Sequence, residues 1–396
     1  MLNVAIIGTG AISAAHIAAY LTFPARCRIA AVCDIYPDKA AAKVEQFQLQ
    51  AEVYADYEDI VKRDDIDLVS ICTPPYTHAE LSIAFLQAGK HTIVEKPMAS
   101  SLEECDRMIA AAEKSGRLLS VIAQNRFTTP MMKLKNVLES GLTGPINHVQ
   151  VDSYWWRGYN YYDLWWRGTW EKEGGGCTLN HAVHHLDIFQ WMNGMPEEIT
   201  AMMCNTSHDD AEVEDISVAI ARYKNGALAQ LTSSVVHHGE EQQIIFQGQH
   251  ARVSAPWKVT TSKAKANGFP EEDPILTAKI QTMYDELPKL EHEGHKGQIA
   301  DVLSAIENLT AVLVDGQQGR QTLELITAIY QAASTGQSVK LPLQSDSLFY
   351  TREGLLSNVR YFYEKKTSVE NSQDVSFSGQ YDYIRWELGH VFSALE

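Results

Sequence analysis

The stretch Val4-Ala5-Ile6-Ile7-Gly8-Thr9-Gly10-Ala11-Ile12-Ser13 decides the fold of this chain. It opens with an apolar run typical of a strand buried on both faces, and a helix-like stretch over 14–21 follows. Gly8 permits a tight turn, Gly10 lets backbone N–H groups approach a pyrophosphate, and the small Ser13 lets helix and strand pack closely. This order predicts a dinucleotide-binding unit at the start of the chain.

The second expected strand, over 29–33, ends at Asp34. That spacing suits an acid that hydrogen-bonds a ribose 2′-hydroxyl, and a carboxylate there would repel a 2′-phosphate. NAD is therefore favoured over NADP, although the nearby Lys39 keeps NADP open. The alternative interpretation makes Asp34 a turn residue at the end of a strand.

Strands and helices alternate through the rest of the first half. Strands are expected over 67–72, 91–94 and 118–121, and helices over 57–61, over 79–88 and from 101. This alternation predicts a doubly wound parallel sheet, a Rossmann domain over 1–125. Ligands bind at the carboxyl ends of such strands. The segments expected there are Thr73-Pro74 with His78, Glu95-Lys96-Pro97, and Asn125-Arg126.

Length and composition limit the class of protein. At 396 residues two domains are expected, and the net charge of −17 argues against nucleic-acid or anionic-membrane partners. An acidic substrate would need a local basic pocket. The six cysteines are scattered without a CxxC, and no secretory signal or membrane-length apolar run is seen. A cytoplasmic location with reduced thiols is expected.

The second half predicts an α+β domain over 126–343. Strands near 145–151, 216–222, 227–233 and 243–247 are expected to form a large, mostly antiparallel open sheet. Helices are expected from 295 and over 321–333, and a variable loop region over 256–290. The remaining residues, 344–396, are expected to form an extension packed on this domain; its aromatic clusters include Tyr381-Asp382-Tyr383.

An aromatic stretch over 154–170 contains Trp166 and Arg167. Aromatic faces suit sugar rings, and they are equally common in subunit interfaces, so both interpretations stay open. The glycine run 174–176 then precedes an expected helix over 177–192, with Asn180 and His184 on one face. Taken alone, His184 would be interpreted as a buried structural histidine. His181 and His185 have metal-ligand spacing, but no motif completes a site, so no metal is expected.

In this order, Gly8-Thr9-Gly10, Asp34, Thr73-Pro74 with His78, Glu95-Lys96-Pro97 and Asn125-Arg126-Phe127 resemble the glucose-fructose oxidoreductase / inositol dehydrogenase (Gfo/Idh/MocA) family up to about residue 340. The resemblance implies that Lys96 lies beside a nicotinamide and the reacting hydroxyl. Asn180 stands where many members have an acid. Lys96, His184 and Asn180 are the expected catalytic residues. The expected cofactor-binding residues are Gly8, Gly10, Ala11, Ile12, Asp34, Thr73, Pro74, His78, Glu95, Lys96, Asn125 and Arg167. The expected substrate-binding residues are Lys96, Arg126, Trp166, Asn180 and His184.

The family also implies a function. We expect an NAD(P)-dependent oxidoreductase that transfers a hydride between a secondary hydroxyl of a sugar, sugar derivative or cyclitol and the nicotinamide. Two alternatives are a redox-neutral, NAD-dependent glycoside-cleaving enzyme and a non-enzymatic NAD-binding sensor. The resemblance also implies a homodimer or homotetramer, which would cover the free face of the open sheet. The sequence does not distinguish Lys96 from His184 as the proton acceptor.

Overall fold

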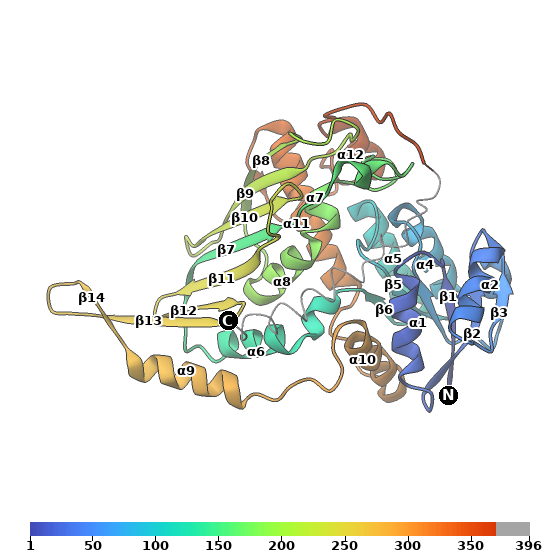
Figure 1. Cartoon of the computed structure of the whole chain (residues 1–396), viewed down its shortest axis with the longest axis horizontal. Helices are drawn as coiled ribbons and strands as arrows, with labels where there is room; N and C mark the ends of the chain where they lie inside the picture. The colour runs from blue at the N-terminus through green and yellow to red at the C-terminus, as the bar shows by residue number, and fades with distance from the viewer. Residues whose placement is uncertain (370–396) are drawn as a thin grey trace.

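The computed structural model describes residues 1–369 as two sheets with helices packed around and between them (Figure 1). The first sheet has six strands in the order β3-β2-β1-β4-β5-β6, and all its pairings are parallel. This order is that of a Rossmann fold, as the sequence predicted. The strands are β1 (Leu2–Ile7), β2 (Cys27–Cys33), β3 (Glu52–Tyr54), β4 (Leu68–Ile71), β5 (His91–Val94) and β6 (Leu119–Val121).

Helices cover both faces of this sheet (Figure 1). They are α1 (Ser13–Leu21), α2 (Pro37–Gln46), α3 (Tyr57–Val61), α4 (His78–Gln87) and α5 (Leu102–Ser115). The side chain of Ser101 caps α5, the helix expected from residue 101, by accepting a hydrogen bond from the backbone N–H of Glu104. Helix α10 (Gly294–Asn308) comes from the second half of the chain but packs against α1.

The end of β1 requires a glycine. Gly8 has φ 90°, and a Cβ at this position would come within 2.9 Å of the backbone carbonyl of Cys72 and of Thr73 Cγ2. The strand register places Ile7, Ile71 and Val94 in one row across β1, β4 and β5. The segments that follow these strands, which begin at Gly8, Cys72 and Glu95, therefore emerge side by side at one edge of the sheet.

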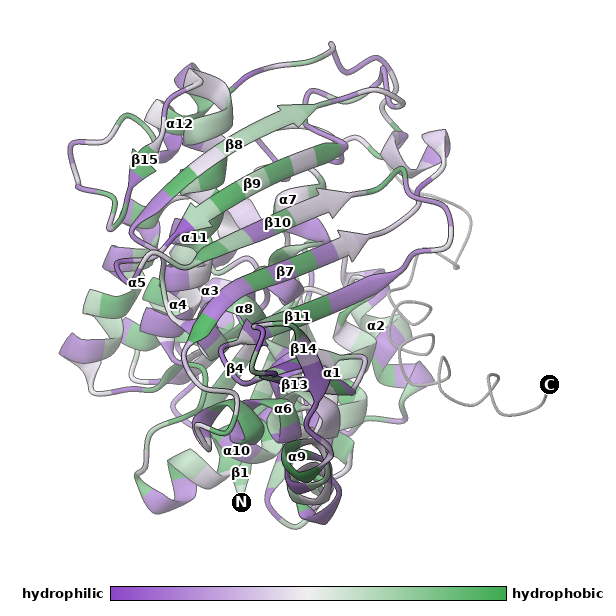
Figure 2. Cartoon of the chain, turned by 90° about the vertical axis from the view of Figure 1, so that its left-hand side faces the viewer, coloured by the Kyte–Doolittle hydropathy of each residue, from purple (hydrophilic) through white to green (hydrophobic). Residues whose placement is uncertain are grey.

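The second sheet has nine strands in the order β14-β13-β12-β11-β7-β10-β9-β8-β15. Every pairing in it is antiparallel except that of β7 with β10. One broad face of it carries no helix over β7 to β10 (Figure 2). The strands are β7 (Ile146–Tyr154), β8 (Glu198–Cys204), β9 (Ile216–Arg222), β10 (Leu228–Ser234), β11 (Gln242–Gly248), β12 (Ala251–Ala255), β13 (Lys258–Ala264), β14 (Pro270–Glu272) and β15 (Val339–Lys340).

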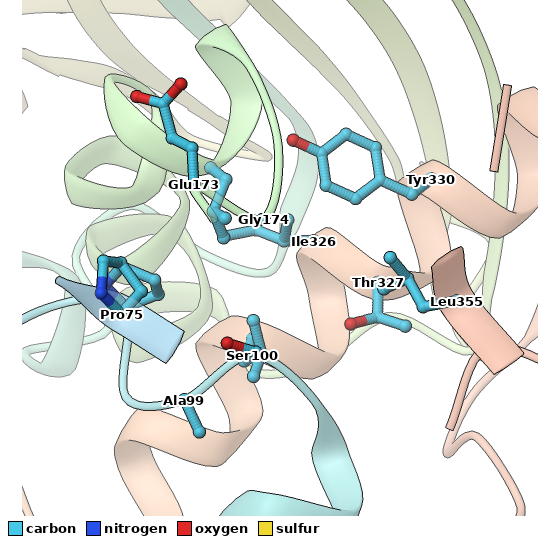
Figure 3. A pocket seen from close by; sticks show the side chains of 12 residues that line it. Pro75, Ala99, Ser100, Glu173, Gly174, Ile326, Thr327, Tyr330 and Leu355 are labelled. Atoms are coloured by element: carbon cyan, nitrogen blue, oxygen red, sulfur yellow. The ribbon is translucent and has the colours of Figure 1, made fainter. Parts of the chain in front are cut away.

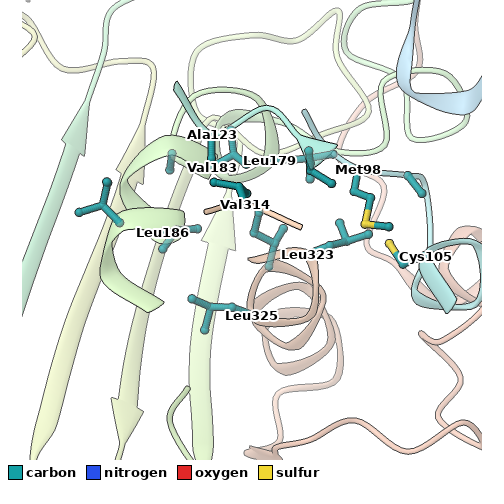
Figure 4. Close-up of a cluster of buried hydrophobic side chains, with 14 of the residues drawn as sticks. Met98, Cys105, Ala123, Leu179, Val183, Leu186, Val314, Leu323 and Leu325 are labelled. Atoms are coloured by element: carbon teal, nitrogen blue, oxygen red, sulfur yellow. The ribbon is translucent and has the colours of Figure 1, made fainter. Parts of the chain in front are cut away.

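Helices α8 (Val183–Asn193) and α11 (Gly316–Thr335) lie between the two sheets (Figure 1). Buried side chains from both helices meet residues that follow β5 and β6, as the cluster around Leu186, Leu323 and Met98 shows (Figure 4). Burial of such apolar surface contributes about 25 cal/mol per Å2. This shared core holds the helix that carries His184 against the edge of the first sheet.

The expected helix over 177–192 is wrong in one respect, because the structure divides it into α7 (Cys177–Asn180) and α8. At the break the N–H of Ala182 bonds to the carbonyl of Cys177, five residues back. The carboxylate of Glu214 accepts hydrogen bonds from the N–H groups of Gly176 and Thr178 and fixes the start of α7. This long-range partner cannot be recognised from the local sequence.

The expected loop over 256–290 is also wrong. It contains β13, β14 and α9 (Pro274–Glu286), whose first turn is capped by the side chain of Asp273. Only Ile280 of α9 is buried, so the sequence carries little helical periodicity there. The last helix of the second half begins earlier than expected, because α11 already starts at Gly316; α6 (Thr129–Glu139) begins this half.

The extension beyond 343 contains α12 (Arg352–Asn358) and then runs along the aromatic stretch. Val369 forms a parallel bridge with Leu164, and its N–H and C=O bond to Asp163 and Trp165. The aromatic cluster at Tyr381 lies outside the described residues. None of the helices within residues 1–369 combines the length and apolar character needed to cross a membrane.

Candidate functional site

Lys96 lies two residues beyond the end of β5, at the sheet edge that also carries the glycine loop. Its Nζ donates a hydrogen bond of 3.3 Å to the backbone carbonyl of Asn180. Lys96 and His184 also line one small cavity between β6, α8 and α11. The three residues that the sequence predicted as catalytic are thus brought together, although Lys96 lies more than eighty positions before the other two.

The glycine run fixes Asn180. Its Nδ2 donates to the backbone carbonyls of Gly175 and Gly176, at 2.7 and 3.2 Å. A Cβ on Gly175 would lie 2.2 Å from the Tyr330 hydroxyl, and one on Gly176 would lie 2.0 Å from the Glu214 carbonyl. Both positions therefore require glycine. Because the amide nitrogen of Asn180 donates to these carbonyls, its amide oxygen is the atom that could accept a hydrogen bond from a ligand hydroxyl.

His184 is held neutral. Burial, followed by the positive charge of Lys96, keeps the pKa of its imidazole well below the usual value. A neutral imidazole offers one donor and one acceptor. His184 can therefore hydrogen-bond a hydroxyl in either direction, but formation of its imidazolium is unfavourable.

The glycine loop has the geometry expected of a dinucleotide site. Gly10 is exposed, and nothing lies within 4 Å of a Cβ built on it. Asp34 Oδ2 accepts hydrogen bonds from the N–H and the hydroxyl of Thr9, at 2.8 and 2.6 Å. Asp34 thus sits beside the loop, as predicted for the ribose-binding acid. Of the other residues predicted to bind the cofactor, Ala11 is exposed and Ile12, Thr73, Pro74 and Asn125 are half-buried.

Glu95 does not face the cleft, which corrects its prediction as a cofactor-binding side chain. The carboxylate is buried and bonds to His16 Nε2 at 2.9 Å and to the backbone N–H of Lys96 at 3.1 Å. His295 Nε2 lies 3.5 Å from it. These histidines hold the pKa of Glu95 well below its usual value, against the opposing and larger effect of burial. The Glu95 carboxylate therefore holds the backbone of Lys96 through its N–H, and its negative charge is directed at His16 rather than at the lysine amine.

His78 and Arg126 need the same correction, because neither side chain is exposed. The ring nitrogens of His78 bond to the backbone carbonyls of Thr73 and Pro97, both at 2.8 Å. Arg126 binds Asp187 through Nε and Nη2, both at 2.7 Å, and Gln318 through Nη1. Both side chains hold loops at the site in place, and both are buried within the described chain.

The aromatic stretch divides between interior and surface. The rings of Trp155 and Tyr161 contact His181, at centroid distances of 5.8 and 5.6 Å. Trp156 is 46% exposed. The Arg167 guanidinium stacks on Trp166 and pairs with Glu173. The stretch thus contains both buried and exposed aromatic side chains, and its substrate and interface interpretations both stay predictions.

His181 and His185 have metal-ligand spacing, but within residues 1–369 they do not belong to a group with metal-ligand geometry. His185 bonds to Ser153, and the only group of His, Cys, Asp and Glu residues with metal-ligand geometry in residues 1–369 is the buried one of His16, Glu95 and His295. Sequence reasoning did not identify this group, because its members come from α1, the end of β5 and α10.

A second cavity lies between the Pro97–Ser100 turn and α11, and Glu173 and Tyr330 stand at its rim (Figure 3). Glu173 is buried, accepts a 2.6 Å bond from the Gly168 N–H and pairs with Arg167 at 3.1 Å. Burial raises the pKa of Glu173 to about 7, because it outweighs the opposing charge of Arg167. No local motif marks Glu173 as a titrating group, because its burial depends on the folded chain.

Glu173 should make the folded state less stable as pH rises. Its carboxyl binds a proton more tightly in the folded chain, so stability should fall between about pH 4.5 and pH 7, by up to about 1.4 kcal/mol per pH unit. Glu173→Gln should remove much of this slope in urea unfolding followed across the range. Glu353→Gln, at an exposed position of α12, is the control and should keep it. An unchanged slope in Glu173→Gln would contradict the assignment.

Comparison with known proteins gives matches along most of the chain. The family model for the oxidoreductase family with an NAD-binding Rossmann fold (GFO_IDH_MocA) matches residues 2–123, and the GFO/IDH/MocA C-terminal domain matches residues 131–254. A 1-carboxy-3-chloro-3,4-dihydroxycyclohexa-1,5-diene dehydrogenase of Comamonas testosteroni is 31% identical over 203 residues, 49% of each chain. Inositol 2-dehydrogenase of Salmonella typhimurium is 31% identical over 192 residues, 48% of this chain and 54% of the relative. The chain thus matches about half the length of these curated relatives.

Among solved structures, the WlbA dehydrogenase of Bordetella pertussis, in complex with NADH and UDP-GlcNAcA, superposes with a TM-score of 0.74. It is 27% identical, and the match covers 87% of this chain and 98% of that one. The two family models together take in more than half of the sequence, on both sheets and on both sides of Lys96. The chain therefore belongs to the Gfo/Idh/MocA family of oxidoreductases and has that family's NAD-binding Rossmann domain.

Proposed function

We propose that this chain is an NAD-dependent dehydrogenase that oxidises or forms a secondary hydroxyl of a sugar, sugar derivative or cyclitol. One observation carries the proposal: Lys96, Asn180 and His184 meet at the edge of the parallel sheet where the Gly8–Gly10 loop also emerges. A hydroxyl held by these side chains would lie beside the cofactor site. The family membership and the activities named for the relatives support the same function.

The chain's own residues handle the proton. When bound, the nicotinamide supplies the hydride acceptor. We propose that His184 donates a hydrogen bond to the reacting oxygen, that Asn180 accepts a hydrogen bond from a neighbouring substrate hydroxyl, and that Lys96, in its neutral amine form, takes the proton of the reacting hydroxyl. His184 is the weaker candidate for that step, because burial disfavours its imidazolium. The buried Glu95, bonded to the N–H of Lys96, holds the backbone of the lysine in place.

The test is a panel of sugars, glycosides and inositols with NAD and NADP, followed by the absorbance of the reduced cofactor. Stoichiometric NADH formation with at least one member is expected. Cleavage of a glycoside without net NADH would instead support the redox-neutral alternative. Tight NAD binding without any turnover across the panel would support the sensor. The names of the relatives include both a neutral inositol and a carboxylated substrate, so they leave the charge of the substrate open.

Asp34 should set the choice between NAD and NADP. Asp34→Ser removes the carboxylate that we propose for the ribose hydroxyls and that also holds Thr9. Affinity for NADH should fall about 10- to 100-fold, as for loss of charge-assisted hydrogen bonds, while affinity for NADPH should fall less or rise. Fluorescence titration with both cofactors measures the ratio. Asp38→Ser on α2 is the control. An unchanged ratio in Asp34→Ser would contradict the role.

We also propose a homodimer or homotetramer formed through the helix-free face of the second sheet. Apolar side chains on adjacent strands of this face are exposed: Met202 on β8 is 79% exposed, and Val218 and Ile220 on β9 are 42% and 44% exposed. A patch of this kind commonly marks an interface. Light scattering should give a mass of two or four chains, and Met202→Asp with Ile220→Asp should give one. A monomeric wild type would refute this proposal.

The domain limits at 125 and 343 and the cytoplasmic location stay predictions. The continuous first sheet and the family match to residues 2–123 support the first limit. Helix α10 nevertheless packs on α1, so the first domain would be completed by a segment from the second half.

A further inference from the structure

Three basic side chains meet around one aromatic ring beside Lys96. The Tyr161 ring lies 5.6 Å from the ring of His181. The guanidinium carbons of Arg157 and Arg167 lie 5.6 and 4.1 Å from the same ring. His181 directly follows Asn180, whose carbonyl accepts the hydrogen bond from Lys96. We call Lys96, Arg157, Arg167 and His181 the basic cluster.

The basic cluster brings cationic side chains together in a chain whose net charge is −17. Among residues 1–369, Glu240 pairs with Arg157 at 2.8 Å and Glu173 pairs with Arg167 at 3.1 Å. Because burial raises the pKa of Glu173 to about 7, this group is only partly ionised at neutral pH. Glu173 therefore balances the charge of Arg167 only in part.

The basic cluster also contains buried nitrogens without partners. Arg167 uses Nη1 for Glu173 and for the Tyr161 hydroxyl, while its buried Nε has no hydrogen-bond partner among residues 1–369. In Arg126 the corresponding edge of the guanidinium holds a carboxylate, that of Asp187, through Nε and Nη2. Within the described chain, His181 Nδ1 is likewise buried and without a partner. A buried polar group without a partner costs about 1–3 kcal/mol, which a ligand that supplies the partner recovers.

His181 adds a neutral donor to this arrangement. Burial first, and then the charges of Arg157, Arg167 and Lys96, keep its pKa well below the usual value. The ring of Trp155 packs beside it, at 5.8 Å. The surroundings are therefore dry and positively charged, which strengthens the attraction for an anion.

We propose that the basic cluster is the subsite for a carboxylate of the substrate, and that the enzyme acts on an acidic sugar or cyclitol. The carboxylate would lie against Arg157, Arg167 and His181, with the reacting hydroxyl at Lys96. A carboxylate matches the planar edge of a guanidinium, as the pairing of Arg126 with Asp187 through Nε and Nη2 shows. Arg167, predicted from the sequence to bind the cofactor, thereby moves to the substrate side. The inference rests on the proposed dehydrogenase function.

The first test measures binding to the NADH-loaded enzyme by calorimetry. D-Glucuronate is compared with D-glucose, and D-galacturonate with D-galactose, so that the members of each pair differ at one carbon. The acid should bind at least about tenfold more tightly than its neutral partner in at least one pair, and 0.5 M NaCl should reduce the difference. Equal affinities in both pairs, or no binding by either acid, would overturn the proposal. Tighter binding of D-glucose 6-phosphate than of D-glucuronate would overturn the assignment to a carboxylate.

The second test uses two variants with opposite expected effects. Arg157→Gln should reduce the preference for the acid about tenfold, and Glu240→Gln should increase it. A purely structural role would weaken the acid and the neutral sugar alike, so the ratio separates the two explanations. Arg107→Gln, at an exposed position of α5, is the matched control and should leave the ratio unchanged. A ratio that neither Arg157→Gln nor Glu240→Gln changes would refute the subsite.

The two proposals fail in different ways. If no sugar of either kind forms NADH but the acids bind selectively, the dehydrogenase proposal is wrong and the subsite stands. If neutral sugars form NADH and the acids show no advantage in binding, the function stands and the subsite is wrong.

Discussion

Replacing Lys96 with methionine should lower kcat by about a hundred- to ten-thousandfold, the range expected for loss of a general acid–base. Methionine keeps most of the length of the side chain but removes the amine, whose hydrogen bond to the Asn180 carbonyl directs it into the site. The first sheet and the glycine loop do not depend on this amine, so the Kd for NADH should stay within about threefold. Steady-state kinetics with the best substrate of the panel and NADH titration measure both quantities.

Lys258→Met, at an exposed position of β13, controls for the loss of one positive charge from the chain and should leave kcat unchanged. Near-normal turnover in Lys96→Met would remove Lys96 from the chemistry. In that case, His184 would become the candidate proton acceptor in spite of its depressed pKa.

Replacing Asp187 with alanine should lower the free energy of unfolding by about 3–5 kcal/mol, the cost of leaving a buried charge without its partner. The Arg126 side chain has no exposed surface, and Asp187 accepts two of its hydrogen bonds at 2.7 Å. Without the carboxylate, only the neutral oxygen of Gln318 remains for the guanidinium. Because Arg126 follows β6 and Asp187 lies on α8, the loss should also loosen α8, which carries His184. Guanidinium unfolding, compared at equal m-value, measures the change.

Two further variants separate charge from packing. Arg126→Met with Asp187→Leu removes both charges and should recover much of the loss. Glu198→Ala, which breaks a surface pair with the half-exposed Arg222, should cost less than about 1 kcal/mol. If Asp187→Ala and the double variant were equally unstable, lost packing rather than an unpaired charge would be responsible.

The first half of the fold could be predicted because its signals are local. The expected strand over 91–94 is β5, and the expected helix over 14–21 differs from α1 by one residue. Buried parallel strands consist of continuous apolar runs, and the glycine loop marks the first turn. In the second half, α9 was missed because it buries only Ile280, and the break before α8 depends on Glu214, which lies 36 residues beyond Thr178.

The site was predictable to a similar extent. The order of the motifs predicted that Lys96, Asn180 and His184 belong to one site, and in the structure these residues lie close together. The motifs did not reveal the partners that bury three other side chains of the predicted site: Glu95 bonds to His16 and Arg126 to Asp187, each more than sixty residues away. His78 bonds to the nearer backbone carbonyls of Thr73 and Pro97. The arginines of the aromatic stretch are visible in the sequence, but their convergence on Tyr161 and His181 is a property of the folded chain alone.

The pairing of Val369 with Leu164 has a consequence for how this enzyme can be recombined with others. The segment over 362–369 contacts Glu212, Asp210 and the aromatic stretch, so it helps to hold that stretch in its conformation. A chimera that contained residues 154–170 without this segment would have the amino-acid sequence of the loop but not its conformation. The proposed carboxylate subsite therefore depends on two segments that are distant in sequence, and both would have to be transferred together.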